Sequence, residues 1–167
     1  MKSLLTIMTL LLLLSLTVFC QISGILPDPK VKVTISILKD TVKFGDDILL
    51  TMTLLNETEQ IQSVWFDTPK SSTGGPAWTS VFLINTATGK SPLKYSNKAV
   101  LSSQAYSAEE IKTFSYQLKP GQSVTGQFSL YDMVVTNTNS YKLNKGSYVL
   151  QVDYLSNSSK SVRFVVD

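Results

Sequence analysis

Paired acidic side chains are the residues of this sequence that could do acid-base chemistry, because such a mechanism needs two carboxyl groups close together. Each pair stands in or beside a segment typical of a turn, where solvated carboxylates are the usual occupants. The pairs are Asp46 with Asp47, Glu57 with Glu59, and Glu109 with Glu110. The first pair could also offer oxygens to Ca²⁺, but its spacing matches no EF-hand loop. We predict neither a catalytic pair nor a calcium site.

The side chains that usually carry nucleophilic or zinc chemistry are missing. The 167 residues contain no histidine, and Cys20 is the only cysteine. Without histidine, Ser-His-Asp and Cys-His catalysis and zinc sites of the His-Glu-x-x-His type are excluded. With one cysteine, no disulfide can form within the chain. We predict that the protein is not an enzyme and that it uses no cofactor.

A loop between residues 67 and 79 could support recognition instead. It is rich in Gly, Pro and Ser, and an exposed tryptophan in such a loop can anchor a protein or stack on a sugar. The candidate binding residues are Thr68, Pro69, Gly74, Gly75, Pro76 and Trp78. In the alternative interpretation, the Trp78 ring folds back over the end of the domain as a plug.

The charged residues argue against nucleic acid as a partner. The chain has 15 basic and 12 acidic residues, and its basic residues are scattered. A protein that binds nucleic acid electrostatically needs clustered Lys and Arg. We therefore predict a protein or glycan partner and no nucleic acid.

Residues 1–20 are typical of a secretory signal peptide, because Lys2 precedes an apolar run over residues 4–19. We expect cleavage between residues 20 and 25, and a linker with two prolines over residues 21–29. The run is shorter than the roughly 20 apolar residues that span a bilayer. The sequence thus predicts a secreted, extracellular protein without membrane contact after cleavage. A retained membrane anchor and lipidation of Cys20 are the alternatives.

Two sequons would accept N-glycans if the source is eukaryotic. They are Asn56-Glu57-Thr58 and Asn157-Ser158-Ser159. The prediction of glycans at these sequons depends on the signal peptide, since such triplets are common by chance in chains rich in Ser and Thr.

Residues 30–167 are predicted to fold as one all-β domain. Short segments rich in Val, Ile, Thr, Tyr and Phe alternate with clusters of Gly, Pro, Asn, Asp and Ser, which is the pattern of strands and turns. The clearest strands cover residues 31–37, 48–55, 61–66, 80–85, 147–154 and 161–166. With shorter strands between them, the pattern predicts an antiparallel β-sandwich of about 7 to 9 strands.

Four residues suggest an immunoglobulin-like register for this sandwich. Tyr148 stands two residues before Leu150, which is the spacing of the corner tyrosine and the second cysteine in immunoglobulin domains. Met52 and Leu150 would then take the disulfide positions, with Trp65 packed over them in the core. This predicts an immunoglobulin-like sandwich without a disulfide.

Several segments together resemble the N-terminal propeptide-like domain of secreted deuterolysin-type zinc metallopeptidases, including the peptidyl-Lys endopeptidases. The resemblance covers most of the predicted domain, and its most specific part is Trp65-Phe66-Asp67-Thr68-Pro69. The other segments are residues 50–58, Val81-Phe82-Leu83, Tyr95, residues 118–123, Leu130-Tyr131-Asp132 and Gly146-Ser147-Tyr148. In that family the domain precedes a catalytic domain and assists its folding or restrains its activity. The resemblance implies a sandwich without the enzyme and transfers no functional residue.

The sequence therefore predicts a secreted, non-catalytic binding module. Loops at the end of a rigid sandwich are where recognition usually takes place. The resemblance adds a peptidase-regulating role, with an extracellular metallopeptidase as the partner. The alternative is a carbohydrate-binding or adhesive extracellular module that uses Trp78 and Tyr106.

Overall fold

The computed structural model describes residues 28–66, 76, 78–96, 109, 112–113, 115–138 and 142–167. The described chain is all-β, as predicted, with almost no helix; helix α3 covers only Leu130–Met133. It contains twelve strands, three of which are only two residues long, whereas about 7 to 9 were expected. The predicted signal peptide, Cys20 and most of the predicted linker lie outside the described residues. Within the described part, no helix is long and apolar enough to cross a membrane.

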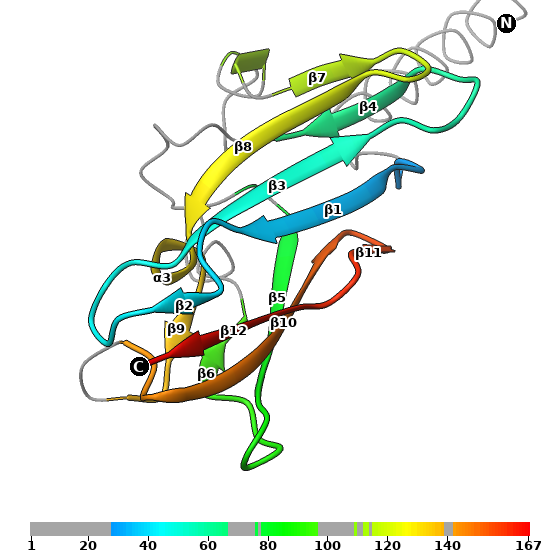
Figure 1. Ribbon diagram of the computed structural model, residues 1–167. Coiled ribbons are helices and arrows are strands. Elements are labelled where there is room, and N and C mark those ends of the chain that lie inside the picture. Colours follow the sequence, from blue (N-terminus) through cyan, green and yellow to red (C-terminus); the bar gives the residue numbers. More distant parts are fainter. Residues whose placement is uncertain are drawn as a thin grey trace, which may run out of the picture.

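The first large sheet has the order β1-β3-β8 and is antiparallel throughout (Figure 1). Its strands are β1 (Lys32–Ile37), β3 (Leu49–Leu55) and β8 (Ser123–Ser129). In β1 and β3 every second residue is apolar, and all of these except the partly buried Ile37 are buried, which gives each strand one face toward the core. The predicted alternation in these two segments is therefore confirmed.

The second large sheet is built around β10 (Gly146–Tyr154). β5 (Thr79–Asn85) pairs with one edge of β10, and β12 (Val162–Val166) and the short β11 (Asn157–Ser158) pair with the other. β2 (Thr41–Val42) runs parallel to β12 and extends the sheet. β1 lies against β10, β11 and β12, so the two sheets face each other.

Two smaller pairings complete the strands. β4 (Gln62–Trp65) pairs with β7 (Ser115–Leu118), and β6 (Leu93–Tyr95) pairs with β9 (Val135–Thr136). In the view of Figure 1, β4 and β7 lie at the β8 side of the first sheet, whereas β6 and β9 lie near the opposite end of the molecule.

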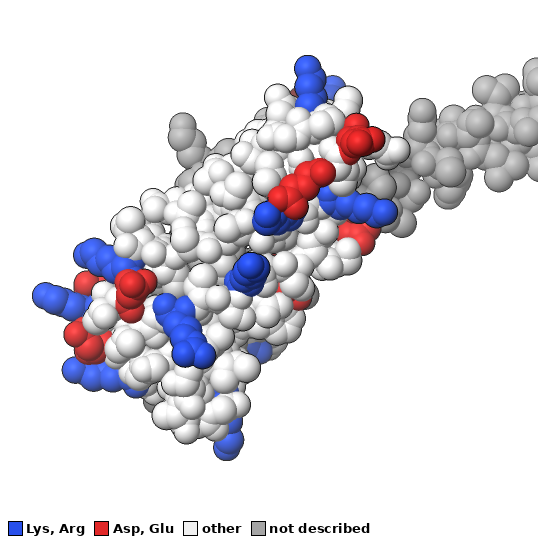
Figure 2. Space-filling model, turned by 45° about the vertical axis from the view of Figure 1, so that its right-hand side comes forward, with Lys and Arg blue, Asp and Glu red and all other residues white. Residues whose placement is uncertain are grey.

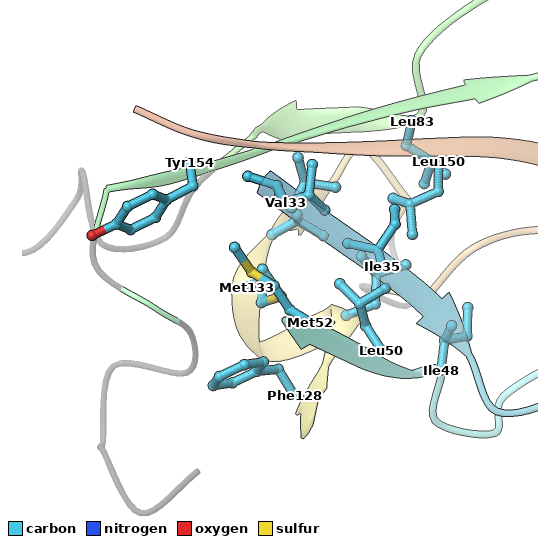
Figure 3. Packing of buried hydrophobic residues seen from close by; sticks show 14 of the residues in the cluster. Val33, Ile35, Ile48, Leu50, Met52, Leu83, Phe128, Met133, Leu150 and Tyr154 are labelled. Atoms are coloured by element: carbon cyan, nitrogen blue, oxygen red, sulfur yellow. The ribbon is translucent and has the colours of Figure 1, made fainter. Parts of the chain in front are cut away.

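The core lies between the two large sheets. Figure 3 shows Ile35, Leu50 and Met52 of the first sheet gathered near Leu83 and Leu150 of the second. Leu50, Met52 and Leu150 are completely buried. Burial of each large aliphatic side chain contributes about 1.5–3 kcal/mol, so this cluster is the main source of stability in a chain without a disulfide.

The corner tyrosine has the hydrogen bond that its spacing predicts. Tyr148 is buried, and its hydroxyl donates to the main-chain oxygen of Asn144 at 2.7 Å. In immunoglobulin domains the corner tyrosine bonds to the main chain a few residues upstream in the same way. This bond and the buried Met52 and Leu150 favour an immunoglobulin-type arrangement.

The expected core position of Trp65 is wrong. Side chains alternate between the two faces along β4. Val64 and Phe66, the residue after the end of β4, are buried on one face, whereas Trp65 is only partly buried on the other. β4 pairs with β7 and not with the Tyr148 strand. The residues opposite Leu150 within the sheet are Leu83 of β5 and Val162 of β12. The sequence predicts strands over both 61–66 and 80–85, and only the pairing across the sheet decides which of them lies beside β10.

Candidate functional site

The predicted binding loop is only partly described. Thr68, Pro69, Gly74 and Gly75 lie outside the described residues. Pro76 is buried, and Trp78 is 54% exposed. The ring of Trp78 is therefore available at the surface, as the binding hypothesis requires, rather than a buried plug.

Trp78 is held in an unusual main-chain conformation. Its φ is 64°, and that of Leu155 is 52°, both in the left-handed region. For a bulky residue this conformation costs on the order of 1–3 kcal/mol and persists only where its surroundings impose it. The Leu155 N–H donates to the Trp78 carbonyl at 3.0 Å, and the Thr79 hydroxyl donates to the Pro76 carbonyl at 2.7 Å. These bonds fix the main chain on both sides of the ring.

Trp65 lies next to Trp78. The ring centroids are 6.4 Å apart and the ring planes are tilted by 44°. Distances of about 4.5–7 Å are typical of interacting aromatic pairs. The two rings come from segments that are separated in the sequence, and together they form an aromatic surface that we call the Trp65–Trp78 pair.

Tyr154 supports this pair from the end of β10. Its hydroxyl accepts a hydrogen bond from the Trp65 N–H at 2.9 Å and donates to the Trp65 carbonyl at 3.1 Å. Burial raises the pKa of Tyr154 to about 12, with the hydrogen bond to Trp65 opposing part of that rise. The hydroxyl therefore stays protonated at ordinary pH and can keep donating. No local pattern in the sequence indicates this role, because Tyr154 and Trp65 are 89 positions apart.

One carboxylate of each of the first two acidic pairs, Asp47 and Glu57, bonds to other groups of the domain. An Asp47 carboxylate oxygen accepts a hydrogen bond from the Ile48 N–H at 2.9 Å and another from the Ser129 hydroxyl. Glu57 forms an exposed ion pair with Lys32 at 2.6 Å. Among the residues that the structure describes, no three His, Cys, Asp or Glu side chains are grouped so that they could hold a metal ion.

The sequon at Asn56 has a structural role that conflicts with glycosylation of the folded domain. Asn56 is completely buried, and its side-chain nitrogen donates to the carbonyls of Gln60 at 2.7 Å and Leu118 at 2.8 Å. Its side-chain oxygen accepts from both the N–H and the hydroxyl of Thr58. A glycan would replace one donor hydrogen and would need space where none is open. The prediction of a glycan at Asn56 is therefore wrong for this fold.

The second sequon is less enclosed. Asn157 is partly buried, and its side-chain nitrogen donates to the carbonyls of Pro29 at 2.8 Å and Tyr154 at 3.2 Å. Its oxygen accepts from the Val31 N–H at 3.4 Å. Asn157 thus ties the start of the described chain to β11, and a glycan there stays a prediction.

The sequence matches no protein-family model and is not significantly similar to any curated protein sequence. Among solved structures, it is similar to a mutant β-glucosidase from Listeria innocua in complex with laminaribiose, with a TM-score of 0.46 and 11% identity. The match covers 84% of this chain and 16% of that one. The β-glucosidase in complex with gluconolactone gives a TM-score of 0.43 and 10% identity, with 82% and 16% of the two chains covered.

A third similar structure is the Pseudomonas fluorescens alkylpurine DNA glycosylase AlkC bound to DNA containing an abasic site analogue. Its TM-score is 0.43 and its identity 15%, with 83% of this chain and 30% of that chain covered. The chain thus spans less than a third of each of these proteins. Likenesses this weak carry no inference about activity, and the resemblance to the deuterolysin-type propeptide domain stays a prediction.

Proposed function

We propose that this chain is a secreted, non-catalytic binding module that contacts an extracellular protein through the Trp65–Trp78 pair. The observation that carries the proposal is the exposure of Trp78, 54%, on a main chain fixed in the left-handed region. Large aromatic side chains on rigid supports dominate the energetics of many protein interfaces. The resemblance to a propeptide-like domain suggests a secreted metallopeptidase as the partner.

A protein partner suits the geometry better than a glycan. The rings are tilted by 44° to each other, so they do not offer one flat surface for neighbouring sugar rings. The hydroxyls of Tyr154 and Thr79 beside the rings already bond to main-chain groups of the domain. Sugar sites combine a stacked ring with polar groups that converge on the ligand, whereas the Trp65–Trp78 pair is chiefly apolar.

The proposal is tested with purified protein and secreted metallopeptidases of the source organism, by calorimetry and by assays of peptidase activity. Trp78→Ala should weaken binding at least about tenfold, since hot-spot truncations cost about 2 kcal/mol or more. Phe44→Ala is the matched control, because Phe44 is similarly exposed at 48% and the change should leave affinity unaltered.

Two results would contradict the proposal. One is a lack of binding and of any effect on the peptidases at micromolar concentrations. The other is glycan-array binding that disappears in Trp78→Ala while the melting temperature is unchanged, which would establish the carbohydrate-binding alternative.

A further inference from the structure

The outer face of the second large sheet, which points away from the core, carries exposed apolar side chains. Residues opposite each other on paired strands lie on the same face of a sheet, so the pairing of β10 with β5 and β12 defines this face. Phe82 and Ile84 of β5 are 50% and 47% exposed, and Val165 of β12 is 38% exposed. Val149 of β10 lies opposite Ile84 and is partly buried. Contiguous apolar groups on a protein surface often mark an interaction site.

Two opposite charges lie on either side of the exposed phenylalanine on this face. Phe82 lies opposite Gln151 of β10, and this pair forms a row across the strands. Arg163 of β12 lies in the row on one side, opposite Val149, and Asp153 of β10 lies in the row on the other side. Each of these rows is two residues, about 7 Å, from the Phe82–Gln151 row. The two charges are therefore placed symmetrically about that row.

Arg163 is exposed and has no partner within the described part of the chain. No ion pair or side-chain hydrogen bond links it to another described residue. The Asp153 carboxylate accepts a hydrogen bond from the Gln151 side chain at 3.0 Å, which holds it on the outer face. The main chains at Arg163 and Asp153 are about 14 Å apart, four residue steps along β10 and one strand spacing. Arg163 is thus available to a carboxylate of another molecule.

We propose that two copies of this chain associate through this face, related by a two-fold axis that lies along the Phe82–Gln151 row. A two-fold interface joins the same surface of both copies, so that surface must be complementary to itself. Rotation about this row exchanges the rows on its two sides. Arg163 then comes within about one strand spacing, 5 Å, of the partner subunit's Asp153, and the long arginine side chain spans that distance. The Phe82 rings of the two copies meet at the axis.

A second copy suits this surface because each copy supplies both the cation and the anion. Two ion pairs form, and neither charge is left in the interface without a partner. An aromatic residue at the centre with polar groups around it is the usual anatomy of an interface. The three strands cover only about 14 Å by 20 Å, which is small for a stable complex, so we expect a reversible dimer. This inference does not rest on the function proposed above.

The test is sedimentation equilibrium of the purified protein, which measures the Kd of the dimer. We expect a Kd of about 100 µM or below. Phe82→Ser should raise the Kd at least about tenfold, because it removes the aromatic residue at the axis. The melting temperature of the monomer should change little, because Phe82 is half exposed. Ile61→Ser is the control, since Ile61 is 59% exposed just before β4, away from this face, and its Kd should match that of the wild type.

Charge reversal separates a two-fold dimer from general adhesion. Arg163→Glu and Asp153→Arg each place like charges opposite each other, so each variant alone should dimerise at least about tenfold more weakly. In an equimolar mixture of the two variants every facing pair is again of opposite charge. The mixture should therefore form a heterodimer with a Kd within about threefold of the wild-type value, which also shows that both variants are folded.

Three results would overturn the proposal. Wild-type protein that stays monomeric at about 1 mM would leave the face to a different partner. Unchanged dimerisation of either single charge variant would show that Arg163 and Asp153 do not face each other. Charge variants that fail to associate when mixed, while the wild type dimerises, would exclude the two-fold arrangement.

Discussion

Replacing Asn56 by alanine should destabilise this domain strongly, although the residue lies in a segment that reads as a surface sequon. The side chain is completely buried and takes part in four hydrogen bonds, two as donor and two as acceptor. A net contribution of about 1 kcal/mol for each bond gives a loss of about 3–5 kcal/mol. That is a large share of the roughly 5–15 kcal/mol by which domains are stable.

The assay is equilibrium unfolding in urea, followed by tryptophan fluorescence. Asn137→Ala is the control, since Asn137 is exposed and its side chain donates one hydrogen bond, to the Leu93 carbonyl at 3.0 Å. The control should lose no more than about 1 kcal/mol. A loss below about 1 kcal/mol in Asn56→Ala would refute the assignment of these four bonds as structural. So would a glycan found on Asn56 of the folded, secreted protein by peptide mass spectrometry.

Three further predictions concern the core and its support of the site. Gly126→Ala should lower stability by about 1–3 kcal/mol, because its Cβ would lie 2.8 Å from ring atoms of Phe66 and Phe128; an unchanged melting temperature would contradict this packing. Phe66→Ala should lower the free energy of unfolding, measured in urea, by about 3–5 kcal/mol, and Trp65→Ala should lower it clearly less. The reverse order would show that Trp65, and not Phe66, is the core residue of this segment. Tyr154 has a folded-state pKa of about 12, against 10.0 in the unfolded chain. Its contribution of about 2–3 kcal/mol to the free energy of unfolding is therefore complete below pH 10 and is lost as the pH rises toward 12. If a Tyr154→Phe variant loses as much stability between pH 10 and 12 as the wild type, Tyr154 is not the source of that loss.

Much of the fold class follows from the sequence alone. Alternating apolar residues in 31–37 and 48–55 determine strands with one buried face, and that pattern is local, so it can be read without tertiary information. Met52, Tyr148 and Leu150 were expected in the core by spacing, and the structure buries all three. The composition likewise excludes histidine-dependent catalysis and an internal disulfide in any fold of these 167 residues.

Only the tertiary structure decided which strands become neighbours and which faces they bury. A shift of one residue moves every side chain of a strand to the other face, so Trp65 and Phe66 exchange roles according to how β4 pairs. The polar bonds of Asn56 to Leu118 and of Tyr154 to Trp65 join positions 62 and 89 residues apart. Such features depend on long-range pairing, which no local pattern of residues encodes.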